Sequence, residues 1–242
     1  RQAADARAVY TGGAYKIECE KIGRELDEAR LYCGIYYSLR FFGGGQNVKA
    51  SAVEVRPRVT EKDLKDELVL RASYTTDFST SSEGRAHNVT YAANKFGGVV
   101  LAPGEALSFN ALVGDRTEEN GFKTAKIIVD GKYVDGVGGG VCQASTAVYN
   151  AALVAGLSVS SNAHSICPSY CPPGLDAMIS SVSDLVVTNT TGKNVYFAVR
   201  SGGGKVTVDI YGEKNEYDIV PESVVDGVIP HDTVETLDSD GK

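Results

Sequence analysis

The sequence contains no tryptophan and only one methionine, three histidines and five cysteines among its 242 residues. It also lacks any run of about 18 consecutive apolar residues, so we expect no membrane-spanning helix within it. Positive charge is scarce as well, because 24 Lys and Arg stand against 31 Asp and Glu, for a net charge of −7. This acidic balance argues against nucleic acid or an anionic membrane as the main partner.

The two ends of the sequence indicate that it belongs to a longer protein. No signal peptide precedes Arg1, and the last residues form the polar tail VETLDSDGK. We therefore expect an export signal or membrane anchor outside these residues, and an extracellular protein in the cell wall or on the outer side of the membrane. The length suffices for one large domain or two small ones, each with a core.

Glycine, in contrast, is abundant, with 27 residues, and three of them are consecutive at 138–140. Without side chains the backbone there can turn tightly, and another group can approach it closely. Small apolar residues then recur at steps of three and four between Ala144 and Ala155, which predicts a buried helix. Gly156 is the usual residue for a left-handed helix end. Cys142 therefore belongs to the first turn of this helix.

Cys142 is the best single candidate for a nucleophile. A helix N-terminus stabilises an anion through its free N–H groups and positive dipole end, and this lowers the pKa of a thiol placed there. The N–H groups of Cys142 and Gln143 could hold the oxyanion that forms when the sulfur attacks a carbonyl. The alternative is that Cys142 is only a small buried hydrophobic residue. The glycines favour the nucleophile, because a structural helix start more often carries a Ser, Thr, Asp or Asn cap.

A cysteine nucleophile needs a base, and histidine suits this role near neutral pH. His164 is the best placed of the three histidines, because the 22 residues from 142 to 164 allow helix, loop and strand to return to the helix start. Asp176, expected on the next strand, would orient the imidazole through its other nitrogen. The order Cys, His, Asp is that of papain-like and transglutaminase-like cysteine enzymes, an analogy of fold that says little about the substrate.

Hydrophobic periodicity predicts mixed helices and strands elsewhere. Residues 1–47 read as an amphipathic helical arm that ends in the glycines of FFGGGQN. A strand, a helix capped by Thr60 and a second strand are expected over 48–78, and Asn88 is the expected N-cap of the next helix. Two strands around a Pro-Gly turn and an Asp-Gly hairpin then lead to the glycine run. Three alternating segments within 184–212 predict an antiparallel sheet.

Three cationic side chains upstream of the glycine run are candidates for binding an anion. Arg85 and His87 are expected just before a helix, where a ligand carboxylate would meet positive side chains and free N–H groups. Arg116 lies in a polar loop, and its guanidinium fork matches a carboxylate. The plainer alternatives are a solvated loop with an incidental histidine, and a surface ion pair of Arg116 with Glu118 or Glu119.

An odd number of cysteines indicates two disulfides and one free thiol, the pattern expected of an exported cysteine enzyme. The suggested pairs are Cys19–Cys33 and Cys167–Cys171. A rival interpretation makes His164, Cys167 and Cys171 three ligands of a zinc ion. We favour it less, because Pro168 and Pro172 stiffen the loop and no fourth ligand is obvious nearby.

Six segments between about Ser73 and Gly212 carry a resemblance to a known family. They are GRAHN, LAPGEALSFN, VGDRTEENGFKTAKII, GVGGGVCQASTAVYNAALVAGL, HSICPSYCPPGLDA and DLVVTNTT. Together they resemble the VanW-like domain family, which occurs in cell-envelope proteins of Gram-positive and related bacteria, often beside peptidoglycan-binding or G5 modules. The resemblance implies that Cys142 is the nucleophile and His164 its base, since some members act as L,D-transpeptidases. Members commonly read GRDA where this chain has Leu175 in the second position, so that arginine is absent.

We therefore predict an α+β fold with a papain- or transglutaminase-like arrangement, in which the nucleophile helix packs on an antiparallel sheet. The predicted parts are a helical arm or remnant of an upstream module (1–47), a VanW-like catalytic domain (48–212) and a linker or start of a further module (213–242). The predicted activity is cysteine-dependent acyl transfer on peptidoglycan stem peptides, without a cofactor, as an L,D-transpeptidase that could also be a carboxypeptidase. The alternative is a non-catalytic peptidoglycan-binding module. The remaining substrate-binding candidates are Asn110, Gly139, Gly140, Ser145, Thr146 and Tyr170.

Overall fold

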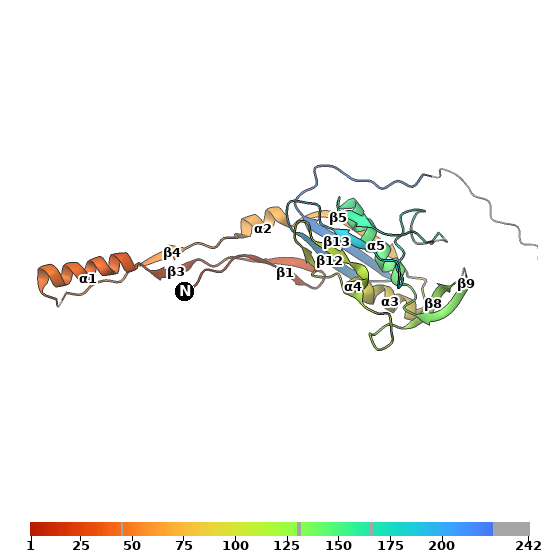
Figure 1. Ribbon diagram of the computed structural model, residues 1–242, viewed down its shortest axis with the longest axis horizontal. Helices are drawn as coiled ribbons and strands as arrows, with labels where there is room; N and C mark the ends of the chain where they lie inside the picture. The colour runs from red at the N-terminus through yellow and green to blue at the C-terminus, as the bar shows by residue number, and fades with distance from the viewer. Residues whose placement is uncertain (45, 130–131, 165–166, 225–242) are drawn as a thin grey trace, which may run out of the picture.

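The computed structural model of this protein describes residues 1–44, 46–129, 132–164 and 167–224 (Figure 1). These residues form an α+β fold in which all paired strands are antiparallel. The helices are α1 (Glu28–Phe42), α2 (Glu61–Glu67), α3 (Glu83–Asn94), α4 (Phe109–Val113) and α5 (Val141–Val154). The strands are β1 (Arg7–Thr11), β2 (Ala14–Glu18), β3 (Gly23–Leu26), β4 (Ala52–Val55), β5 (Val69–Asp77), β6 (Val100–Leu101), β7 (Ala106–Ser108), β8 (Thr124–Val129), β9 (Lys132–Val137), β10 (Ser158–Ser160), β11 (Val186–Thr188), β12 (Val195–Gly202) and β13 (Lys205–Gly212). None of the described helices is both long and apolar enough to cross a membrane.

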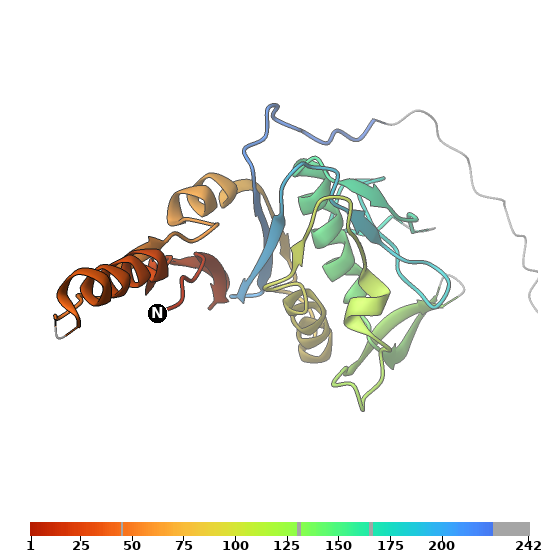
Figure 2. The same cartoon turned by 60° about the vertical axis from the view of Figure 1, so that its left-hand side comes forward.

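The core is a four-stranded sheet with the order β5-β13-β12-β6, covered on one face by α3 and α5 (Figure 2). Phe197 on β12 and Ile210 on β13 are fully buried in the core cluster that the helices share. The Phe197 ring lies 6.1 Å from that of Phe96, just beyond α3. Burying each such side chain stabilises the fold by about 1.5–3 kcal/mol. The predicted packing of the Cys142 helix on an antiparallel sheet is thereby confirmed.

The opposite face of this sheet receives the β1–β2 hairpin. The ring of Tyr15 lies 5.4 Å from Tyr196 and 6.2 Å from Tyr211, which sit side by side on β12 and β13. The Tyr15 hydroxyl donates to the carbonyls of Val99 and Phe197, so the hairpin is fixed to the sheet by polar as well as aromatic contacts.

The N-terminal arm is only partly the helix that the sequence predicts. Residues 7–18 form a hairpin, because Gly12 and Gly13 provide the positive φ angles, +60° and +83°, that a tight turn needs. The helix is confined to α1, which begins at the N-cap Asp27 and ends at the left-handed Gly43. The paired strands β3 and β4 connect α1 back to the sheet, so the arm extends away from the core (Figure 1).

The helix caps differ from the prediction at one of two positions. The Thr60 cap of α2 is confirmed, with a capping box in which Thr60 and Asp63 exchange hydrogen bonds. The predicted N-cap Asn88 is wrong: α3 begins six residues earlier, at Ser82, whose hydroxyl accepts from the Arg85 amide. Asn88 is buried in the middle of the helix instead.

Two smaller sheets complete the fold. The segment Val186–Thr188 forms β11, which lies between β10 and β7 in a separate three-stranded sheet and does not pair with β12 or β13. The predicted single sheet over 184–212 is therefore wrong in this part. The predicted hairpin is confirmed as β8 and β9, although its Asp-Gly turn lies outside the described residues. This hairpin projects from the core beside the start of α5 and leads directly into the glycine run (Figure 1).

Candidate functional site

The helix α5 begins where the glycine run leaves no room for side chains. Gly140 is its N-cap, with φ +103° and no side-chain cap. A Cβ atom on Gly139 would lie 2.5 Å from the Lys126 carbonyl oxygen, and one on Gly140 would lie 2.8 Å from Cγ of Arg85. The glycines are therefore needed for close packing against β8 and α3, and they place Cys142 in the first turn of the helix, half-buried.

The structure brings Cys142, His164 and Asp176 together. Asp176 is 5% exposed, and its Oδ2 lies 2.6 Å from both the backbone nitrogen and Nδ1 of His164. A side-chain hydrogen bond with Cys142 is the largest cause that raises the pKa of His164; burial lowers it, and Asp176 raises it further. The Cys142 sulfur and the Asp176 carboxylate therefore both favour the protonated form of the imidazole that lies between them. The Cys142 thiol also donates to the Ile179 carbonyl at 3.5 Å, a contact that no sequence pattern indicated.

Asp176 lies in a loop and not on the strand that the sequence predicts, since only the isolated bridge between Asn162 and Met178 forms there. The loop is fixed to α5 by two hydroxyl groups. Ser145 Oγ donates to the Ala177 carbonyl at 2.6 Å, and Thr146 Oγ1 accepts from the Ala177 amide at 3.1 Å.

The same two contacts correct two substrate-binding predictions. Ser145 and Thr146 are both 0% exposed, so they hold Asp176 in position and have no surface to offer a substrate. Asn150, one turn further along α5, adds a bond to the Leu175 carbonyl at 2.7 Å. The helix that carries the thiol therefore also fixes the acid that orients the imidazole.

One of the two predicted oxyanion donors is already engaged. The Gln143 amide donates to the Gly140 carbonyl at 2.9 Å. Its side chain is 1% exposed and donates to Thr76 Oγ1 and the Asp77 carbonyl. Within the part of the chain that the structure describes, the amide of Cys142 has no acceptor, so this amide is the donor left for an oxyanion.

Two guanidinium groups lie close enough to Cys142 for its charge to act on them. Arg85 donates to Ser81 Oγ at 2.8 Å and to Gln143 Oε1 at 2.7 Å, and its guanidinium lies 5.9 Å from the centre of the Tyr170 ring. Arg116 donates to Asn110 Oδ1 and packs against Gly138. Burial lowers the pKa of both arginines, whereas a negative charge on Cys142 raises it.

Two more of the predicted residues, Tyr170 and Asn110, contact the two arginines. Burial raises the pKa of the Tyr170 hydroxyl, and the charge of Cys142 adds to this effect. Asn110 is held in place because its amide group donates to the carbonyls of Ser180 and Ser183 at 3.0 and 2.9 Å. Tyr170 therefore lies within range of the Cys142 charge and beside Arg85, and Asn110 fixes Arg116.

His87 does not belong to this group. Arg85 and His87 lie within α3 and not before it, and they point in different directions. His87 Nε2 lies 2.8 Å from the Gly121 carbonyl, and its ring stacks on Tyr91 with 5.7 Å between ring centres. Its predicted role in the site is therefore wrong.

Asn88, next in sequence, has a positioning role that sequence reasoning missed. Its side chain donates to the carbonyls of Lys123 and Gly139 at 2.8 and 3.0 Å and accepts from the Lys123 amide at 2.8 Å. These bonds tie the glycine run and the chain before β8 to α3. The signal in the sequence is a polar amide at a core position of the helix, which requires internal partners.

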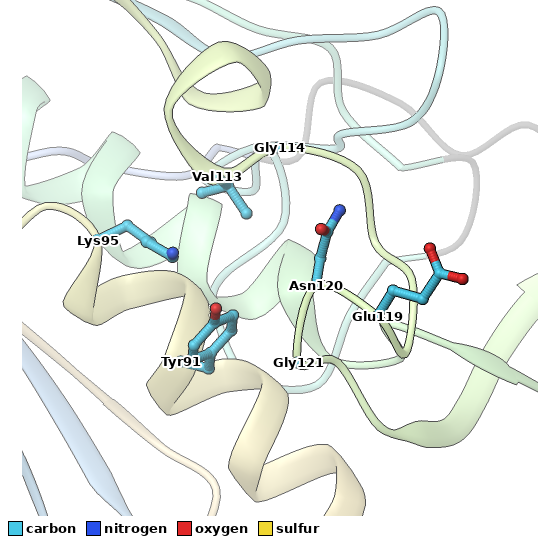
Figure 3. Close-up of a pocket in the computed structure, with 7 residues that line it drawn as sticks. All are labelled: Tyr91, Lys95, Val113, Gly114, Glu119, Asn120 and Gly121. Carbon is cyan, nitrogen blue, oxygen red and sulfur yellow. The ribbon is translucent and has the colours of Figure 1, made fainter.

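Two open hollows lie along α3 on the side of His87. The first, of about 410 Å³, is lined by Tyr91, Lys95, Val113, Gly114, Glu119, Asn120 and Gly121 (Figure 3). The second, of about 500 Å³, is lined by Glu83, Ala86, His87, Thr90, Tyr91, Asn94 and Lys123. Neither hollow is lined by Cys142, His164 or Asp176.

The cysteines form neither metal ligands nor disulfides in this structure. Among residues 1–44, 46–129, 132–164 and 167–224, no three His, Cys, Asp or Glu side chains are grouped to hold a metal ion, so the zinc interpretation of His164, Cys167 and Cys171 is wrong. All five cysteines are free thiols, and Cys19 Sγ lies 3.5 Å from Glu61 Oε2. Neither expected disulfide, including that of Cys19 with Cys33, is present in this structure.

Comparison with known proteins identifies relatives of the chain. It is 31% identical over 179 residues to the uncharacterized protein YoaR of Bacillus subtilis (strain 168), covering 73% of this chain and 59% of YoaR. It is 27% identical over 139 residues to the vancomycin B-type resistance protein VanW of Enterococcus faecalis (strain ATCC 700802 / V583), covering 54% of this chain and 50% of that protein. The chain thus spans 59% and 50% of the lengths of these two relatives.

No solved structure matches the chain, so the papain- or transglutaminase-like part of the fold prediction has no structural relative to support it. The family model described as VanW like protein matches residues 84–211. This range runs from α3 to β13 and includes Cys142, His164 and Asp176. The protein therefore belongs to the VanW-like family.

Proposed function

We propose that this protein transfers acyl groups on peptidoglycan stem peptides as a cysteine L,D-transpeptidase. The observation that carries the proposal is the Cys142 thiol at the start of α5, beside an imidazole whose Nδ1 lies 2.6 Å from the Asp176 carboxylate. The name of the enterococcal relative, a vancomycin resistance protein, supports a substrate in the cell wall. The exported location is part of the proposal, and so is a membrane anchor outside these residues.

In the first half-reaction, His164 accepts the thiol proton and the Cys142 thiolate attacks the carbonyl of the third stem residue, meso-diaminopimelate or lysine. The negative charge moves to the carbonyl oxygen, which the Cys142 amide can bind. His164 then donates its proton to the nitrogen of the terminal D-residue as the C–N bond breaks. The products are a thioester on Cys142 and the free D-amino acid.

In the second half-reaction, an amine of a neighbouring stem attacks the thioester. His164 takes a proton from this amine and returns it to the sulfur as the C–S bond breaks. The result is a new amide cross-link and the original thiol. Water in place of the amine would give a carboxypeptidase with the same residues. Asp176 stabilises the imidazolium in both half-reactions and holds the ring in one orientation.

The test is product analysis with the purified protein and the peptide L-Ala-γ-D-Glu-meso-diaminopimelate-D-Ala. We expect wild type to release D-Ala and to form peptide dimers, or the tripeptide if water is the acceptor. Cys142→Ala should yield neither product. Arg7→Gln, at an exposed position at the start of β1, is the matched control and should behave as wild type. If folded wild type leaves the tetrapeptide intact, or if Cys142→Ala retains activity, the proposal is wrong.

The second candidate is a wall-binding module that holds a stem peptide without cleaving it. The specific observation in its favour is Leu175, which stands directly before Asp176 where members of the family commonly carry an arginine. Binding to purified sacculi that survives Cys142→Ala, together with an unchanged muropeptide profile after incubation with wild type, would support this candidate. A changed profile would exclude it.

A further inference from the structure

Beyond the three reacting residues, the site has a feature that concerns the substrate: its arginines have no carboxylate partner. Elsewhere the chain pairs such a group, because Arg200 binds the buried Asp209 through Nε at 2.7 Å and Nη2 at 3.1 Å. Within the residues that the structure describes, neither Arg85 nor Arg116 has a carboxylate oxygen within 4.0 Å. The half-buried guanidinium groups of Arg85 and Arg116 therefore carry positive charge that no carboxylate of the described residues pairs with.

The two arginines differ in how many donors remain free. Arg85 Nη1 is shared between Ser81 and Gln143, and its guanidinium lies over the Tyr170 ring, so this group is largely engaged within the protein. Among the residues that the structure describes, Arg116 makes one hydrogen bond, from Nη2 to Asn110 Oδ1. Its Nε has no acceptor there but is buried, so a ligand cannot reach it directly. Nη1 also has no acceptor among these residues, and it is the donor left for an incoming carboxylate.

The nearest acids cannot serve as that acceptor. Asp184 acts on Arg116 through its charge. However, its oxygens are engaged: Oδ1 accepts from the amides of Asn110 and Leu185, and Oδ2 accepts from the Ser108 hydroxyl. Asp115 is exposed on the loop and forms no ion pair with Arg116 among the described residues. The open donors of Arg116 therefore suit a carboxylate that arrives with the substrate.

The position of Arg116 restricts which carboxylate this is. The side chain packs against Gly138, where a Cβ atom would lie 2.8 Å from Cβ of Arg116, and its guanidinium is within electrostatic range of Cys142. A residue spans at most about 3.3–3.6 Å of chain, so the C-terminal carboxylate of a tetrapeptide lies one residue beyond the attacked carbonyl. The side-chain carboxylate of meso-diaminopimelate lies several bonds further away.

We propose that Arg116 binds the free C-terminal carboxylate of the stem peptide. This inference rests on the proposed function, since it names the substrate of the same site. Asn110 fixes the orientation of the Arg116 side chain.

The test measures binding without turnover, by calorimetry with Cys142→Ala protein. The ligands are the tetrapeptide acid, the same peptide with a C-terminal carboxamide, and the same peptide amidated on the diaminopimelate side chain. We expect the C-terminal amide to bind about 10- to 100-fold more weakly than the acid, the range of one charge-assisted hydrogen bond. Adding Arg116→Gln should remove this difference, Arg116→Lys should retain part of it, and Arg7→Gln should leave it unchanged.

Several results would overturn the inference: equal binding of acid and C-terminal amide, a loss confined to the side-chain amide, discrimination that persists in Arg116→Gln, or no binding of any peptide. If Arg116→Gln does not fold, Arg116→Lys decides the question, because it keeps the charge and loses the fork. The proposed function is judged separately, by acylation of wild-type Cys142. Acylation without carboxylate discrimination would refute only the role of Arg116. Discrimination without acylation would refute only the transferase.

Discussion

The glycine at the start of α5 offers a quantitative test of how the thiol is positioned. Gly140 has φ +103°, a backbone conformation that L side chains rarely adopt, and it caps the helix that carries Cys142. In Gly140→Ala the new Cβ would lie 2.8 Å from Cγ of Arg85 and 3.1 Å from both the Arg85 carbonyl oxygen and Cγ2 of Val89. Backbone strain and overpacking therefore act together at this position.

Each effect has a typical size. A residue held in a sparsely populated backbone region costs roughly 1–3 kcal/mol, and inserting a group into a packed core costs about 1–3 kcal/mol. The sum is about 2–6 kcal/mol of unfolding free energy, which corresponds to roughly 4–24 °C in melting temperature for a chain of this size. Gly104→Ala is the matched control, because Gly104 has φ +78° but nothing within 4 Å of the new Cβ. Gly104→Ala should therefore show the cost of backbone strain but not the cost of overpacking.

Urea unfolding of wild type and both variants, followed by circular dichroism, measures the difference. Gly140→Ala should lose at least about 1 kcal/mol more than Gly104→Ala, the lower limit of the overpacking cost. The rate of Cys142 alkylation by iodoacetamide should also fall in Gly140→Ala and stay at the wild-type level in Gly104→Ala. Equal destabilisation by the two substitutions would refute the argument that close packing at Gly140 positions the helix start.

Other predictions concern the reacting groups. Iodoacetamide should alkylate Cys142 more slowly in His164→Ala than in wild type, because the imidazole beside the sulfur is the group that takes its proton; equal rates in the two proteins would contradict the pairing. Because the pKa of His164 is raised, its contribution to stability is complete below about pH 6.5 and is lost as pH rises through the raised value. The unfolding free energy of wild type minus that of His164→Ala should therefore fall from pH 6 to 9, and a constant difference would refute this linkage. Asp176→Asn should leave a reactive thiol but reduce turnover of the tetrapeptide by orders of magnitude, whereas turnover near wild type would exclude an orienting role. The double variant Cys167→Ala/Cys171→Ala should keep the wild-type alkylation profile, and a shift would place these thiols in the chemistry.

The position of Cys142 in the first turn of α5 could be predicted from the sequence because its signals are local. Three glycines followed by a small-residue helical period specify the start of α5, and the separation of His164 from Cys142 leaves room for the chain to return. The supporting residues carried no such signal. Ser145 and Thr146 could serve either a substrate or the loop at Ala177, and only burial in the folded chain decides for the loop.

The wrong predictions at Asn88 and in the N-terminal arm concern positions where contacts between residues distant in sequence decide the structure. Asparagine is a preferred N-cap residue. The Asn88 side chain instead forms hydrogen bonds with Lys123 and Gly139, which are 35 and 51 residues away in sequence. In the arm, Ile17 lies on strand β2 and not on a helix, because the hairpin turn at Gly12 pairs it with Ala8. Apolar residues at helical spacing can also fall on a strand, and only the turn separates the two cases.

Mass spectrometry of the intact protein tests the central claim most directly. Wild type is incubated with the stem tetrapeptide or with a carbapenem, which a cysteine transpeptidase can open to a stable thioester, and the adduct is then mapped by proteolysis. The account predicts a mass increase equal to the tripeptide acyl group, or to the carbapenem, located on Cys142 and absent from Cys142→Ala. A folded wild-type protein that gains no mass on Cys142 under either condition would contradict it.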